Sequence, residues 1–134
     1  MEIKFIPLQT YGDERGSLVA LEETKNIPFS IKRVYYMFDT KKNVTRGYHA
    51  HRELKQVAIA LKGSCKFILD DSVERVEVIL NDPAKGLLLD SVIWREITEF
   101  SDDCVLMVLA DHHYDESDYI RDYNQFLEES RNEI

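Results

Sequence analysis

Cysteine and long hydrophobic runs are both scarce in this sequence. Only two cysteines occur among the 134 residues, Cys65 and Cys104, and they stand far apart inside apolar alternating runs rather than at metal or redox spacing. We therefore predict reduced thiols of the core without chemistry of their own. No apolar run approaches the roughly 20 residues of a membrane span, and the N-terminal segment lacks the apolar core of a signal peptide. These absences predict a cytoplasmic protein that does not contact a membrane.

Positive charge is also in short supply. Seventeen Lys and Arg face 25 Asp and Glu, which gives a formal net charge of −8, so the mean field of the protein opposes general attraction to nucleic acid or anionic lipid. An anionic ligand would need a local cluster of arginines. The chain shows no internal repeat, low-complexity segment or linker, and its length suits one hydrophobic core. We predict a single domain over residues 1–134.

The sequence does contain a succession of short apolar or alternating runs, which is the pattern of β-strands. Turn residues separate the runs, for example at Lys62-Gly63-Ser64 and Asn81-Asp82-Pro83, and Tyr11-Gly12-Asp13 is interpreted as another turn. This spacing favours an all-β sandwich or barrel. The predicted strands cover residues 3–8, 17–22, 31–38, 54–61, 65–69, 73–80, 87–89, 92–97 and 105–110.

The C-terminal segment has a different period. Its apolar side chains recur at the spacing of one helical face, and the acidic residues from Asp115 to Asp118 supply N-cap oxygens and first-turn charges. We predict one amphipathic helix over about residues 116–131 that packs back on the sheets. The apolar positions are Tyr119, Ile120, Tyr123, Phe126 and Leu127.

A pair of histidines is the most informative local feature. His49 and His51 are two residues apart, so an extended chain turns both side chains to the same face of a sheet. Gln56 follows five residues after His51, and Gly63 another seven on, which is similar to the first sequence motif of the cupin superfamily with its acid replaced by Gln56. An arbitrary pair of this kind is more often a surface or satisfied core pair, but the preceding Arg46-Gly47 and the Gly63 spacing favour a site.

The second cupin motif is incomplete. If Gly86 takes its leading glycine position, Val92 stands where proline is usual and Ile97 where the last histidine ligand belongs. A neutral amide is a poor metal ligand and an isoleucine is none, so we predict a pocket without metal. Imidazoles free of metal suit proton transfer near neutral pH, and general acid–base catalysis becomes the leading interpretation.

Several ordered segments resemble the bacterial TDP-4-oxo-6-deoxy-glucose 3,4-ketoisomerases, small WxcM-like cupin proteins. The resemblance runs from about residue 16 to about residue 126. The segments are Asn26-Ile27-Pro28-Phe29-Ser30-Ile31-Lys32-Arg33-Val34-Tyr35-Tyr36, Arg46-Gly47-Tyr48-His49-Ala50-His51, Asn81-Asp82-Pro83 with Gly86-Leu87, Trp94 with Glu96, and Tyr114-Asp115-Glu116 with Asp118-Tyr119-Ile120-Arg121.

This resemblance implies an all-β cupin jelly roll, a double-stranded β-helix with one C-terminal α-helix. It also implies a homodimer whose N-terminal strands cross to the partner subunit, so the first strand at residues 3–8 is expected to pair with a partner's sheet edge. The implied substrate is a dTDP-linked 4-keto-6-deoxy sugar, and the reaction needs no metal or cofactor. Its 3-keto product would be aminated to a 3-amino sugar.

The chemistry of such an isomerisation can be argued from residue types. Moving a carbonyl from carbon 4 to carbon 3 requires removal of the carbon 3 proton, an enediol, and reprotonation at carbon 4. His49 matches the family's proposed base, and His51 and Tyr35 match residues that move or hold protons on the two sugar oxygens. Without the family, Tyr35 is equally well interpreted as a packed strand aromatic.

The diphosphate of such a substrate must be bound locally, and arginine bonds phosphate with a planar fork. The candidates are Arg15, Arg33, Arg46, Arg95 and Arg121, with Trp94 either stacking on the base or packing in the core. In the family, the residues at the positions of Arg15 and Arg95 are linked to the gluco or galacto outcome at carbon 4. The combination here looks mixed and leaves that outcome open. His112 and His113 are expected to be solvent-facing loop residues.

Three classes of function therefore compete. They are a metal-free ketoisomerase, a metal-dependent cupin oxygenase or epimerase, and a catalytically silent protein that binds sugar nucleotides. The missing ligands place the ketoisomerase first. A binding protein would use the same pocket and differs only in turnover.

Overall fold

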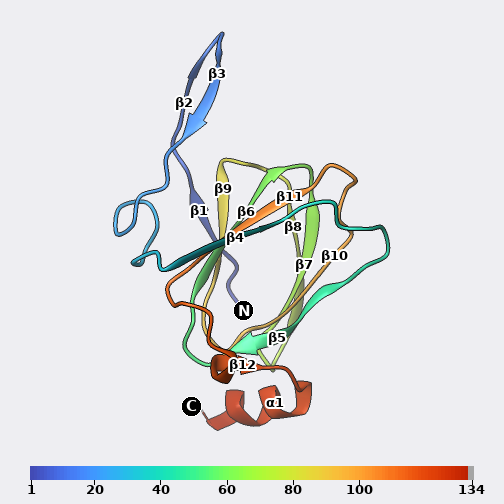
Figure 1. The fold of residues 1–134 in the computed structure, drawn as a ribbon. Helices are drawn as coiled ribbons and strands as arrows, with labels where there is room; N and C mark the ends of the chain where they lie inside the picture. The colour runs from blue at the N-terminus through green and yellow to red at the C-terminus, as the bar shows by residue number, and fades with distance from the viewer. Residues whose placement is uncertain (133–134) are drawn as a thin grey trace.

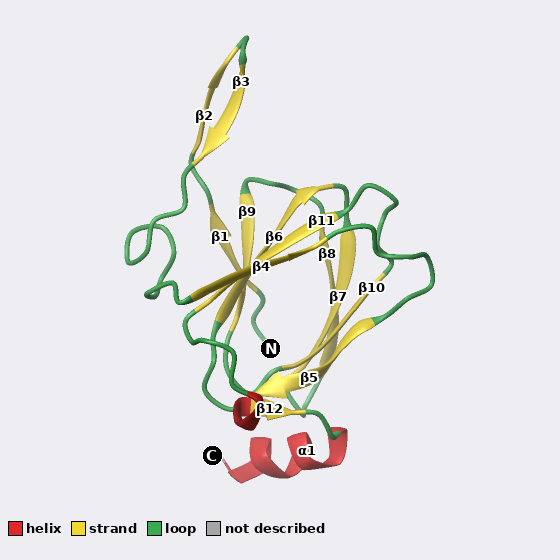
Figure 2. Ribbon diagram, in the orientation of Figure 1, coloured by secondary structure: helices red, strands yellow, loops and turns green. Residues whose placement is uncertain are grey.

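A computed structural model describes residues 1–132 of the chain (Figures 1 and 2). The regular elements of the described part are antiparallel strands, with one short 3-10 turn, η1, and one α-helix at the end. The elements are β1 (Lys4–Pro7), β2 (Thr10–Asp13), β3 (Gly16–Val19), β4 (Arg33–Met37), β5 (Arg46–His51), β6 (Gln56–Lys62), β7 (Cys65–Asp70), β8 (Arg75–Leu80), β9 (Lys85–Leu89), β10 (Trp94–Thr98), β11 (Val105–Ala110), η1 (Glu116–Asp118), β12 (Tyr119–Ile120) and α1 (Tyr123–Asn132).

Two five-stranded sheets face each other. One has the strand order β1-β9-β6-β11-β4, and the other has the order β12-β5-β10-β7-β8. Because alternate residues of each strand point between the sheets, the apolar runs of the sequence meet there. This arrangement confirms the predicted all-β jelly roll. Residues 133 and 134 of the predicted domain lie outside the described residues.

The main core fills the space between the sheets. Phe67 of β7, Leu87 of β9 and Leu106 of β11 are fully buried there. Although Cys65 and Cys104 are far apart in the sequence, both belong to the same buried cluster. They carry no disulfide, which confirms the predicted core thiols. Burial raises the pKa of the Cys65 thiol to about 12, so the thiol stays protonated and unreactive.

The N-terminal strands β1, β2 and β3 pair within the chain. The first strand, β1, pairs with β9 of its own chain, and the expected crossing of N-terminal strands to a partner subunit stays a prediction. The segment interpreted as a turn at Tyr11-Gly12-Asp13 is strand β2, and it pairs with β3 in a hairpin that turns at Glu14 and Arg15. This hairpin projects away from the sandwich (Figure 1).

The C-terminal helix begins later than predicted, at Tyr123 rather than near residue 116. Asp115 caps the 3-10 turn by accepting from the backbone N–H of Ser117, and Tyr119 then has extended backbone angles. The apolar spacing merged this extended segment with the helix, so strand β12 was missed. The helix packs through Phe126 on Trp94 and Ile120. No helix of the described residues is long and apolar enough to span a membrane.

Candidate functional site

A cavity of about 320 Å³ lies between the two sheets. Tyr35 and Gln56 reach it from one sheet, and His49 and Arg95 from the other. Six of the nine site residues predicted from the sequence line this cavity, namely Arg33, Tyr35, Arg46, His49, Arg95 and Arg121.

The shape of strand β5 aims His49 at this cavity. Gly47 has a φ of +95°, which favours glycine, and a Cβ there would lie 2.8 Å from the carbonyl oxygen of Arg95. Tyr48 also has a positive φ, of 57°, and the pairing of β5 with β10 shifts register at this point. This β-bulge leaves His49 directly opposite Arg95.

The imidazole of His49 is a neutral base with a defined orientation. Its Nδ1 lies 3.1 Å from the carbonyl oxygen of Gly47. Because that oxygen can only accept, Nδ1 carries the proton and Nε2 keeps its lone pair. Burial, and next the positive charge of Arg95, lower the pKa of His49 to about 4. At neutral pH the ring is therefore ready to take a proton.

His51 occupies a different position from the one expected, because it does not line the cavity wall. It is fully buried behind two residues that do line it, with its ring centroid 4.9 Å from that of His49 and 4.4 Å from that of Tyr119. Its Nδ1 lies 3.1 Å from Oδ2 of Asp118. Sequence reasoning treated Asp118 as a first-turn acid of the helix and missed this contact, which joins residues 67 positions apart.

A chain of side chains crosses the cavity from Arg95 to Tyr35. The Arg95 guanidinium donates to Oε1 of Gln56 over 2.5 Å, and Nε2 of Gln56 donates to the Tyr35 hydroxyl oxygen over 3.1 Å. The Tyr35 hydroxyl accepts from the amide, so its own proton can be donated into the cavity. Burial raises the pKa of Tyr35, which keeps that proton in place.

Arg95 is an unusual member of this chain because it is a buried cation. Its side chain is 2% exposed, and desolvation lowers its pKa to about 10, still well above neutrality. It donates to Gln56 and to the carbonyl of Ile93. Its Nε, however, has no hydrogen-bond partner within residues 1–132. The guanidinium of Arg95 therefore places a fixed positive charge at the wall of the cavity.

The donor set does not fit a divalent metal. Gln56 stands at the position of the cupin acid and gives its oxygen to Arg95, while Ile97 is a buried aliphatic side chain. Within the described residues, no three His, Cys, Asp or Glu side chains are grouped so that they could hold a metal ion. The buried guanidinium of Arg95 would also repel a cation placed beside His49.

Three further cations lie around the cavity. Arg33 is half-buried and stacks on the ring of Tyr35 with 4.7 Å from guanidinium carbon to ring centroid. Its Nη1 is buried and has no partner in the described part of the chain. Arg121 lies 4.3 Å above the ring of Tyr119 and is paired with Glu116, and Arg46 is exposed. Tyr119 lines the cavity too, although the sequence pattern predicted it as an apolar position of the C-terminal helix and not as a site residue.

Two predicted binding residues lie elsewhere. Trp94 is 4% exposed and packs against Phe126 of helix α1, so it is a packing residue here and not a wall of the cavity. Arg15 sits at the tip of the β2–β3 hairpin, paired with Asp13 and away from the cavity of its own chain. His112 and His113 are exposed after β11, as expected.

Comparison with known proteins gives a consistent result across the whole chain. The sequence model of FdtA, described as WxcM-like, C-terminal, matches residues 1–131. A TDP-4-oxo-6-deoxy-alpha-D-glucose-3,4-oxoisomerase from Aneurinibacillus thermoaerophilus is 56% identical over 126 residues, which are 94% of this chain and 91% of that protein.

Solved structures agree with this relationship. The sugar 3,4-ketoisomerase QdtA from Thermoanaerobacterium thermosaccharolyticum, in complex with TDP, superposes with a TM-score of 0.96 at 42% identity, covering 98% of this chain and 96% of that one. A His-to-Asn variant of the same enzyme, in complex with TDP-4-keto-6-deoxyglucose, superposes with a TM-score of 0.95 at 42% identity, covering 97% and 94%.

Proposed function

The chain belongs to the WxcM-like FdtA family and is a sugar-nucleotide 3,4-ketoisomerase, and we propose that His49 is the base of its reaction. The substrate is TDP-4-oxo-6-deoxy-D-glucose, whose keto group moves from carbon 4 to carbon 3. The observation that carries the assignment is the neutral His49 imidazole, held in one tautomer beside Tyr35 and a buried cation.

The reaction needs one base that takes a proton and returns it to the neighbouring carbon. The free Nε2 of His49 takes the proton from carbon 3, which the adjacent ketone acidifies, and gives it back to carbon 4. Negative charge then builds on the carbonyl oxygen of the enediolate. The buried guanidinium of Arg95 and the Tyr35 hydroxyl supply positive potential and a proton donor in a site of low dielectric, where both act strongly.

Gln56 contributes to this arrangement by fixing the direction of the Tyr35 proton. Its amide N–H already occupies the tyrosine oxygen, so the hydroxyl proton is left for the substrate oxygen. The same amide oxygen satisfies Arg95. In this proposal the residue that replaces the cupin metal ligand acts as a hydrogen-bond bridge.

The nucleotide part of the substrate would lie outside the cavity. A volume of about 320 Å³ is at the small end of ligand sites and suits the sugar ring alone. Arg46 and Arg121 are exposed among the lining residues, and Arg33 has a free Nη1. These three arginines are the proposed diphosphate ligands, because they offer local positive charge on an acidic protein. A cytoplasmic location stays a prediction from the sequence.

We also propose a homodimer in which the β2–β3 hairpin is the exchanged element. All its residues except Val19 are exposed, and Tyr11 and Leu18 are each 60% exposed. Strand β4 is the edge of its sheet and presents Tyr36, 63% exposed, on its outer face. The exposed Tyr11 and Leu18 of the hairpin and the open edge of β4 each lack a covering surface in one chain, and a second copy supplies both.

Deuterium exchange tests the catalytic proposal directly. Incubation with TDP-4-oxo-6-deoxy-glucose in deuterated water should give the 3-keto product by NMR, with deuterium at carbon 4 of the product and at carbon 3 of recovered substrate, because the proton held by the base exchanges with solvent. His49→Asn should keep the fold and lower the rate by roughly 10²- to 10⁴-fold, because an amide cannot accept the proton. The exposed His113→Asn is the matched control and should leave the rate unchanged. Native rates in His49→Asn would remove His49 from the base role.

A further inference from the structure

The carboxylate of Asp118 meets the buried His51 from the 3-10 turn that leads into β12, the strand paired with β5. Its Oδ2 lies 3.1 Å from Nδ1 of His51. The same carboxylate accepts the backbone N–H of Glu53 at 2.9 Å and that of Leu54 at 3.3 Å. Three donors around one carboxylate fit an ionised group, which can only accept. The ring proton of His51 therefore resides on Nδ1.

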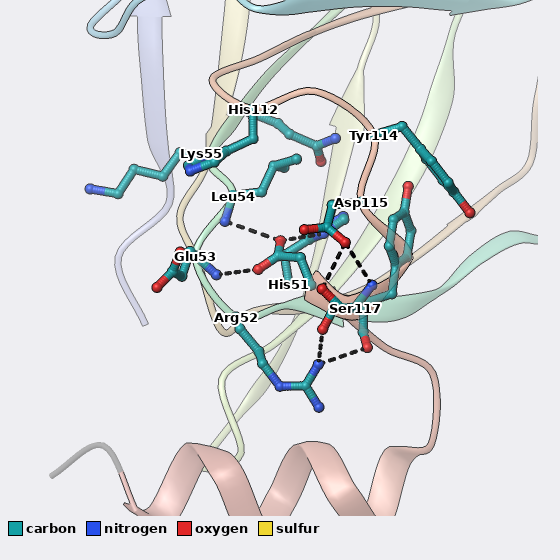
Figure 3. A network of polar contacts seen from close by, with 12 residues as sticks. His51, Arg52, Glu53, Leu54, Lys55, His112, Tyr114, Asp115 and Ser117 are labelled. Atoms are coloured by element: carbon teal, nitrogen blue, oxygen red, sulfur yellow. Dashed lines mark hydrogen bonds and ion pairs between the residues drawn. The ribbon is translucent and has the colours of Figure 1, made fainter.

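The loop that carries Asp118 is held rigidly on both sides of that residue. Nη1 of Arg52 donates to the carbonyl oxygens of Ser117, at 2.6 Å, and of Tyr119, at 3.1 Å. The other side of the guanidinium forms a bidentate pair with Glu129 of helix α1. Figure 3 shows the Arg52 side chain reaching the turn at Ser117. The helix thus sets the position of Asp118.

The opposite ring nitrogen of His51 has nothing to bond. Nε2 is buried and has no hydrogen-bond partner among residues 1–132. An unpartnered buried polar atom costs about 1–3 kcal/mol, so a ligand group that satisfies it is the natural explanation. Both rings packed on His51, those of His49 and Tyr119, line the cavity. The lone pair is one side chain away from the proposed substrate.

We propose that Asp118 is a positioning residue of the isomerisation, which acts by holding His51 in the tautomer with a lone pair at Nε2, and that a hydroxyl of the sugar reaches this lone pair when bound substrate displaces the ring of Tyr119, which packs on His51 and lines the cavity. This assignment rests on the proposed function for its substrate. His49 breaks the carbon–hydrogen bond at carbon 3 and forms the one at carbon 4. His51 accepts a hydrogen bond from the hydroxyl whose proton must pass from the carbon 3 oxygen to the carbon 4 oxygen.

The low basicity of His51 agrees with an acceptor role. Burial, followed by the charge of Arg95, lowers its pKa to about 2, below that of His49 at about 4. The stronger base is therefore the one that lines the cavity, and the weaker one holds a proton in place without removing it.

Asp118→Asn tests the proposal because it changes the acceptor without changing its size. If the amide oxygen keeps the bond to Glu53, the amide N–H₂ faces Nδ1 of His51 and forces the ring proton to Nε2. In the Ser-His-Asp triad, where a buried aspartate orients a histidine in the same way, replacing the aspartate by asparagine leaves the geometry intact but leaves the histidine in the wrong tautomer. We expect kcat to fall by about 10²-fold with little change in KM.

The ¹⁵N spectrum of histidine-labelled protein distinguishes a change in the His51 tautomer from a general disturbance of the structure. In the native protein the His51 signals should show a protonated Nδ1 and a bare Nε2, and in Asp118→Asn the reverse. Asp111→Asn is the matched control. Asp111 accepts the backbone N–H of Lys55 at 2.8 Å, one residue beyond Leu54, and within residues 1–132 it forms no hydrogen bond or ion pair with His51. It should keep both the native His51 signals and the native rate.

A protonated Nε2 in the native protein overturns the proposal even if the variant fails to fold. An unchanged tautomer in folded Asp118→Asn, or a reversed tautomer with native kcat, overturns it as well. If the native protein proves inactive on the substrate, the proposed function fails while the spectra still decide whether Asp118 sets the His51 tautomer.

Discussion

The activity should persist to an unusually acid pH because His49 is a weak base in the folded protein. With a pKa of about 4, about 3% of the imidazole is protonated at pH 5.5, whereas an unshifted histidine of pKa about 6.5 would be about 90% protonated. We expect kcat/KM to stay nearly flat from pH 7.5 to 5.5 and to halve near pH 4. The free enzyme's base sets this limb of the profile.

The same shift predicts how stability responds to pH. The unfolded chain takes up a proton at His49 near pH 6.5, while the folded chain resists it until about pH 4. The free energy of unfolding therefore falls as the pH drops through 6.5 and levels off below 4, and the total loss is about 3 kcal/mol. His51, whose pKa is also lowered, adds to the loss in the same direction.

The assay combines initial rates between pH 4 and 8 with an NMR titration of the histidine rings. Circular dichroism at each pH confirms that the protein is folded. His112 serves as an internal reference, since its exposed ring bonds Asp111 and its pKa is raised. It should titrate above pH 6.5 while His49 does not. A kcat/KM that halves near pH 6.5 in folded protein would refute the reasoning.

Three further outcomes are expected. Gln56→Leu removes the only side-chain acceptor that the described residues give buried Arg95, and we expect it to lower the free energy of unfolding in urea by about 1–3 kcal/mol and to reduce activity. Gln56→Glu keeps an acceptor and should keep the stability. Equal stability of Gln56→Leu and the native protein would contradict the bridging role of Gln56. Phe126→Ala empties a fully buried site under helix α1 and should cost about 3–5 kcal/mol, so a loss below 1 kcal/mol would argue against helix docking. Replacing residues 10–19 by a Gly-Ser linker should convert dimer to monomer by light scattering, and a retained dimer would exclude the hairpin as the exchanged element.

The strands of the sandwich could be predicted because each apolar run buries one face or both. The run at Val105–Ala110, for example, appears unchanged as β11. Two errors share a cause. Residues 119–127 have helical spacing, but Asp115 and its 3-10 turn deliver Tyr119 in an extended conformation. Likewise, the turn residues Gly12 and Asp13 form a strand because they pair with β3. In both places the local residue pattern favoured one structure, and pairing with another strand, which the pattern does not reveal, produced a different one.

The site was predictable where residue type and local spacing carried the signal. His49 could be found from its strand motif, and Arg95, which lies opposite it, is one of the five arginines that the sequence predicts as anion ligands. The depth of each residue was not predictable. His51 was expected on the same face of the strand as His49, but it lies behind the cavity wall. Trp94 packs under helix α1, which follows it later in the chain. Burial depends on contacts between distant segments, and short motifs do not encode them.

The bulge in strand β5 has a consequence for folding that is separate from catalysis. Strand pairs with plain alternation can slip by one residue, and such a slip would turn both histidines to the opposite face. At Gly47 a side chain would collide with the backbone of Arg95, and Tyr48 needs a left-handed conformation. Only one alignment of β5 on β10 places these two residues where the bulge permits them. The irregularity thus fixes the register of β5 on β10 and disfavours misaligned pairing of the two strands.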